Sequence, residues 1–155
     1  MKVVFALALL IFSHTAFSAT SNVYEKSVSK DMEATYQNVY KALEDNGFYV
    51  IFEPNIGKNL EKFSAKWGKE YNQNKLESIR SMVFCSAWYA NQISNSDPSL
   101  LALCPLHITL THKSGQTTIL FIKPSVVAKG SAAEKIAKEL ENDVIKSLES
   151  GLNAN

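Results

Sequence analysis

The sequence has little of what would make it disordered and none of the short motifs that mark common enzymes. Only six of its 155 residues are glycine and four are proline, and no low-complexity run occurs, so disorder is not expected beyond the termini. A Gly-x-Ser-x-Gly element, an H-E-x-x-H motif and a Gly-rich phosphate loop are all missing. We therefore predict no catalytic residues and expect the protein not to be an enzyme.

An excess of one charge is also missing. The chain has 16 basic and 15 acidic residues, and loss of Lys2 with an N-terminal leader would leave 15 of each and a formal charge of zero. A neutral domain without a basic stripe binds nucleic acid and anionic membranes poorly. We therefore expect no nucleic-acid partner.

A long hydrophobic run is absent, and the one short run lies at the N-terminus. Residues 3–12 are apolar and uncharged, Lys2 precedes them, and small residues follow. Ten residues fall short of the roughly 20 needed to span a bilayer, and the pattern is typical of a cleavable signal peptide. Ala16 and Ser18 suit the positions before a cleavage site. We predict a signal peptide at residues 1–18, no stable membrane insertion after cleavage, and a periplasmic or secreted protein with a single domain over residues 22–152.

Cysteine is scarce: the sequence contains two, Cys85 and Cys104. In an exported protein an even number of cysteines indicates a disulfide, which here would stabilise the fold by roughly 3 kcal/mol. Two alternatives stay open. The pair could handle thiols or sulfur as a redox protein or carrier, although no C-x-x-C motif is present, or Cys85 could be buried and reduced.

Hydrophobic periodicity predicts alternating strands and helices. Strands are expected at residues 23–28, 48–52, 79–85, 106–111 and 117–122, with a hairpin turn at 113–116. The first helix begins after Asp31 as its N-cap and ends at Gly47, and a second helix covers residues 60–71. Shorter helical turns follow Ser86 and Asp97. The last helix runs from a Ser131/Glu134 capping box to Gly151. The order predicts an α+β fold, a two-layer sandwich of a mostly antiparallel sheet with helices packed on one face.

Three stretches of the chain resemble a bacterial family known as domain of unknown function 302. They are residues 35–52 with the Asp-Asn-Gly-Phe end of a helix, residues 82–98 with Met-Val-Phe-Cys-Ser-Ala, and residues 101–124 with Leu-Cys-Pro-Leu-His and the hairpin. The resemblance implies a fold similar to the TATA-binding-protein architecture and a homodimer. It implies no activity and no functional residues, and the leader and the helix bearing Trp67 depart from the family pattern.

Aromatic residues near the cysteines are the remaining candidates for a site. They could line a pocket for a flat apolar ligand, although core packing and a dimer interface are the preferred explanation. His107 and Cys104 are too few ligands for haem or a metal, so we predict no cofactor. We expect an exported, non-enzymatic binding or accessory protein, homodimeric, with a small molecule or a protein as partner. The alternative is a thiol- or sulfur-handling redox protein or carrier that uses Cys85 and Cys104, and a third possibility is a purely structural role. The candidate ligand-binding residues are Trp67, Phe84, Cys85, Trp88, Tyr89 and His107.

Overall fold

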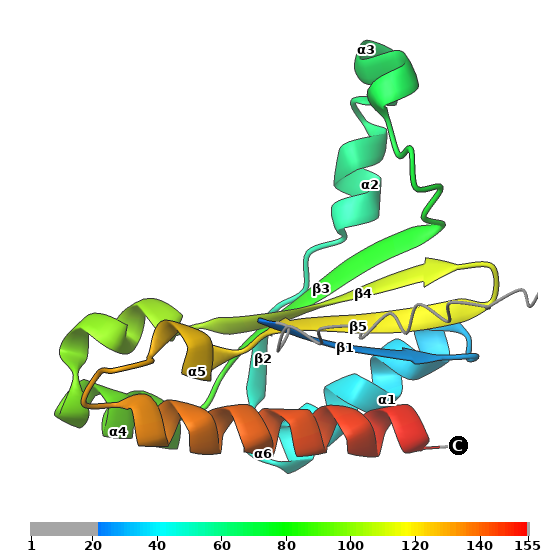
Figure 1. Ribbon diagram of the computed structural model, residues 1–155. Helices are drawn as coiled ribbons and strands as arrows, with labels where there is room; N and C mark the ends of the chain where they lie inside the picture. The colour runs from blue at the N-terminus through cyan, green and yellow to red at the C-terminus, as the bar shows by residue number, and fades with distance from the viewer. Residues whose placement is uncertain (1–21, 155) are drawn as a thin grey trace, which may run out of the picture.

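Five antiparallel strands form one sheet in the computed structural model, which describes residues 22–154 (Figure 1). The strand order is β1-β5-β4-β3-β2. The predicted signal peptide, residues 1–18, lies outside the described residues. The strands are β1 (Val23–Val28), β2 (Tyr49–Phe52), β3 (Ser78–Cys85), β4 (Leu106–Lys113) and β5 (Gln116–Ile122).

Two long helices cover one face of the sheet. Figure 1 shows α1 and α6 side by side beneath it, whereas α2 and α3 stand on the opposite side. The predicted two-layer α+β sandwich is confirmed. The projection formed by α2 and α3 was not part of that prediction. The helices are α1 (Met32–Asp45), α2 (Ile56–Glu61), α3 (Ser64–Trp67), α4 (Ala87–Ser96), α5 (Pro124–Val127) and α6 (Glu134–Asn153), with 3-10 turns η1 (Gly68–Glu70) and η2 (Pro98–Leu103). No helix within residues 22–154 is both long and apolar enough to cross a bilayer.

The register of the strands separates a buried face from an open one. Met82 pairs with Ile108, and Ile108 pairs with Phe121; all three side chains are buried toward α1 and α6. Because side chains alternate along a strand, the intervening residues point away from these helices. We call this second set the open face: Val23, Glu25, Ser27, Tyr49, Phe52, Ile79, Ser81, Val83, Cys85, His107, Thr109, Thr111, Lys113, Gln116, Thr118, Leu120 and Ile122.

Helix α1 begins and ends as the sequence predicts. Asp31 Oδ1 accepts hydrogen bonds from the backbone N–H groups of Ala34 (3.0 Å) and Glu33 (2.8 Å), which lower the pKa of the Asp31 carboxyl. Gly47 follows the helix with a φ of 76°, a conformation that glycine adopts without strain. Both terminal signals therefore act as expected.

The N-terminus of α6 differs from the prediction. Ser131 Oγ donates to the carbonyl of Ala128 (2.7 Å), and the Glu134 carboxylate accepts from the backbone N–H of Gly130 (2.7 Å). The predicted Ser131/Glu134 capping box is therefore wrong, because both side chains close the turn that follows α5. The helix begins only at Glu134.

The C-terminus of α6 also differs from the prediction. Gly151 was expected to end the helix, yet the helix continues to Asn153. Gly151 instead lies where α6 crosses α1, and a Cβ at this position would come within 2.7 Å of the Val39 Cα. Its role is to allow close approach of two backbones.

Candidate functional site

An arm projects from the sheet between β2 and β3. We use this name for residues 55–77, which include α2, α3 and η1 (Figure 1). The sequence predicted one helix over residues 60–71, and this is wrong. The chain is already helical at Ile56, and it breaks after Glu61 and again at Gly68, where φ is 49°.

Local hydrogen bonds shape the two ends of the arm. Asn55 Oδ1 caps α2 by accepting from the backbone N–H of Lys58 (2.9 Å). At the return to the sheet, the Asn72 side chain accepts from the Leu76 N–H (2.9 Å) and donates to the Leu76 carbonyl (2.8 Å). The first bond starts the helix, and the second pair closes a turn. Residues from both ends of the arm line one hollow.

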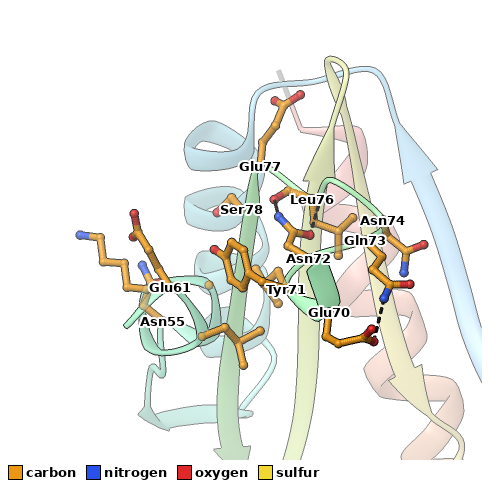
Figure 2. A pocket seen from close by; sticks show the side chains of 14 residues that line it. Asn55, Glu61, Glu70, Tyr71, Asn72, Gln73, Asn74, Leu76, Glu77 and Ser78 are labelled. Atoms are coloured by element: carbon orange, nitrogen blue, oxygen red, sulfur yellow. Dashed lines mark hydrogen bonds between the residues drawn. The ribbon is translucent and has the colours of Figure 1, made fainter. Parts of the chain in front are cut away.

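A hollow of about 650 Å³ lies between these two ends, against the start of β3. In Figure 2 the Tyr71 ring projects into it, with Asn55 and Glu61 on one side and Glu70 on the other. The volume falls within the range of small-molecule sites. Its lining residues are Asn55, Gly57, Lys58, Leu60, Glu61, Glu70, Tyr71, Asn72, Gln73, Asn74, Leu76, Glu77, Ser78 and Ile79.

The charges around this hollow do not balance. Glu61, Glu70 and Glu77 contribute three carboxylates, and Lys58 contributes one ammonium group. Glu77 is occupied in part, since it accepts from the Ser114 N–H (2.9 Å), and Glu70 accepts from Gln73 (2.9 Å). Within residues 22–154, the side chain of Glu61 has no hydrogen-bond or ion-pair partner. The lining therefore offers acceptors and a net negative charge.

The aromatic residues predicted to bind a ligand do not share one cavity. Trp67 lies in the arm, where its ring stacks on Phe63 with centroids 5.1 Å apart. Phe84 is fully buried in the core. Trp88, by contrast, is 65% exposed on α4. These three side chains lie in three different environments.

Two more of the predicted ligand-binding residues, Tyr89 and His107, lie apart from each other. Tyr89 donates a hydrogen bond to Asp143 of α6 (2.6 Å), and burial raises the pKa of its phenol. His107 lies on the open face and lines a second, apolar hollow of about 270 Å³, together with Ala102, Leu103, Pro105, Leu106, Phe121, Ile122, Pro124 and Val127.

The two cysteines come together but are not bonded. Cys85 and Cys104 are both free thiols and both half-buried, so the predicted disulfide is not formed in this structure. Burial, and then the adjoining Cys85 thiol, raises the pKa of Cys104. Within the described part of the chain, no group of three or more His, Cys, Asp or Glu side chains is arranged to hold a metal ion.

Sequence reasoning missed the hollow beside the arm. The predicted helix over residues 60–71 left residues 55–57 and 72–77 outside any helix or strand. One signal was present: three amides and two glutamates crowd into residues 70–77. What could not be read was that α2 would stand opposite them.

A comparison with protein-family models identifies the family to which this chain belongs. A family model described as "Domain of unknown function DUF302" matches residues 24–151, most of the chain. The chain belongs to the DUF302 family. The resemblance noted in the sequence is thereby confirmed at the level of the domain. No curated protein matches the chain.

A solved structure of a DUF302 protein shares the fold. It is a crystal structure of an uncharacterized conserved DUF302 protein from Bacillus stearothermophilus, with a TM-score of 0.69 and 18% sequence identity. The match covers 83% of this chain and 96% of that one. At this identity the similarity shows the shared fold alone.

Proposed function

We propose that this DUF302 protein is a non-enzymatic binding protein that takes a small, positively charged ligand in the hollow beside the arm. The observation that carries the proposal is the lining itself, with three carboxylates against one ammonium group around a half-buried tyrosine. A hollow of this size in which polar groups converge is a candidate place for a small polar ligand.

The chemistry of the lining favours an ammonium-bearing ligand. Glu61 is free to form an ion pair, and the face of the Tyr71 ring can attract a cation. The side-chain amides can bind polar groups on the same ligand. An anion would instead meet excess negative charge, and a purely apolar molecule would leave these polar groups without partners.

Three probes of equal length test this proposal. Isothermal titration with cadaverine, pentanediol and glutarate compares a diamine, a neutral diol and a dianion of similar size. We expect binding of cadaverine alone, weakened about fivefold in Glu61→Gln, since an exposed ion pair contributes up to about 1 kcal/mol. Glu139→Gln, an exposed glutamate on α6, is the matched control and should bind as the unaltered protein does.

Two results would reject the proposal. If pentanediol or glutarate bound as tightly as cadaverine, charge would not be what the hollow recognises. If cadaverine binding were the same in both variants, the diamine would be binding elsewhere.

We also infer that residues 1–18 direct export, on the strength of the apolar run after Lys2 and the small residues before Ala19. The measurement is N-terminal sequencing of the protein recovered from cells that make it. A mature chain beginning at Ala19 is expected, and a native protein that keeps Lys2 would contradict export.

We further propose that two copies pair through the open face. Glu25 and Lys113 are the two residues with a full charge among the seventeen that form it, and Lys113 lies at the hairpin end of β4; depletion of charge is typical of interface cores. Tyr49, Phe52 and Ile122 are more than half exposed on it. A second copy with the same face would remove these side chains from water.

A second candidate function uses the thiol pair. It is favoured by one observation, which is that the two cysteines of the sequence adjoin each other in the fold. The raised pKa of Cys104 lowers the share of reactive thiolate at neutral pH, so ligand binding beside the arm is better supported than redox catalysis.

A further inference from the structure

The two cysteines meet at one end of the sheet, although 18 residues separate them along the chain. Phe84 pairs with Leu106, so the next residue of β3, Cys85, lies beside the start of β4. Cys104 follows η2 and directly precedes this start. The long connection through α4 and η2 thus returns the chain to the residue from which it left.

The two cysteines are partly accessible and lie next to each other. Both side chains are half-buried rather than enclosed, and the two thiols are close enough to hydrogen-bond to each other. Because Cys85 also pairs with Tyr49 of the edge strand β2, the site lies near the end of the open face. It is distinct from the hollow beside the arm, whose lining includes neither cysteine.

We propose that Cys85 and Cys104 together bind one soft monovalent metal ion of the copper(I) class in a two-coordinate site. Thiolates are soft ligands that select copper(I), and this ion is stable with two ligands. A structural zinc site needs four ligands, whereas residues 22–154 provide no third His, Cys, Asp or Glu in reach. His107, although only three residues from Cys104, does not complete such a set.

The binding step balances without an oxidant or reductant. Two S–H bonds break, two sulfur–copper bonds form, and two protons pass to the solvent, while copper stays in the +1 state. Oxidation of the same two thiols to a disulfide would remove both ligands.

The test is a competition titration of the reduced, full mature protein with copper(I) and the chelator bicinchoninate, under anaerobic conditions with ascorbate. We expect one copper ion per chain and X-ray absorption that shows two sulfur neighbours. Cys85→Ser and Cys104→Ser should each weaken binding by more than about tenfold, since each removes one of two ligands. His107→Ala is the control and should leave the affinity unchanged, and circular dichroism checks that each variant is folded.

Several outcomes would overturn the proposal. These are equal copper affinity in either serine variant, a loss of affinity in His107→Ala, or zinc held as tightly as copper. A fourth is mass spectrometry of the alkylated protein that shows an 85–104 disulfide and no copper uptake after reduction. Cadaverine binding by the serine variants should persist in every case, so failure here is separable from failure of the site beside the arm.

Discussion

Gly151→Val is expected to lower the free energy of unfolding by about 3 kcal/mol, and Gly151→Ala by about 2 kcal/mol. A Cβ at this position would lie 2.7 Å from the Val39 Cα, 2.9 Å from the Asn38 carbonyl oxygen and 3.0 Å from the Val39 nitrogen. All three are backbone atoms, so no flexible side chain can move aside. Helices α1 and α6 would have to separate, and buried contacts of Val39 and Leu148 would be lost.

The direction in which Gly151→Ala changes the free energy of unfolding distinguishes this site from an ordinary helix position. In the interior of an exposed helix, alanine is more stable than glycine by about 1 kcal/mol, so a free position would give the opposite result. Urea denaturation followed by circular dichroism measures the difference. Ser150→Ala, at the adjacent exposed position of α6, should change stability by less than about 0.5 kcal/mol. A Gly151→Ala protein as stable as the original would show that the two helices do not touch here.

Gly151 also shows where sequence reasoning ends. A glycine near the end of an apolar stripe is typical of a helix terminus, and Gly47 at the end of α1 follows that rule with a φ of 76°. Gly151 has the same local context but is required by a contact with Val39, more than 100 residues earlier in the chain. Nothing in the local pattern separates a glycine that ends a helix from one that admits a neighbouring helix.

The strands were predictable because their side chains alternate between two environments. The predicted strand at residues 79–85 shows this alternation: Met82 and Phe84 are buried, whereas Val83 and Cys85 lie on the open face. The hairpin followed from Ser114 and Gly115, which both have positive φ as a two-residue turn requires. Local chemistry and tertiary structure agree at these positions.

The arm was misread because its apolar residues have no core to face. Phe63 and Trp67 have helical spacing, yet they remain 47% and 39% exposed and stack mainly on each other. Periodicity predicts a helix whether or not a surface exists for it to pack on. The hollow beside the arm was missed for the same reason, since it depends on the placement of α2 and not on any one motif.

Thr109→Arg is expected to convert a dimer into a monomer by weakening self-association more than about 100-fold. Thr109 lies at the centre of the open face, opposite Ser81 on one side and Leu120 on the other. In the single chain its side chain is half-buried, so a longer one can reach water. Between two packed faces the arginine would be buried without a partner, which costs about 3–5 kcal/mol.

Sedimentation equilibrium at micromolar concentrations measures the effect, and Asn142→Arg, exposed on α6, is the matched control on the opposite side of the molecule. The control should remain dimeric. If the unaltered protein sediments as a monomer, or if Thr109→Arg remains dimeric, the two copies do not pair through the open face.

In the proposed dimer, we expect the arm to contribute contacts beside the open face. Five strands about 4.8 Å apart, paired over about six residues of 3.3 Å, present about 500 Å², whereas a stable interface buries about 800 Å² per partner. The arm projects on the same side as the open face, and the ten residues of α2 and α3 extend about 15 Å, farther than the roughly 10 Å between packed sheets. Its Phe63 and Trp67 rings would therefore reach the flank of the second copy, so Trp67→Ala should weaken the dimer by about tenfold while Thr109→Arg abolishes it.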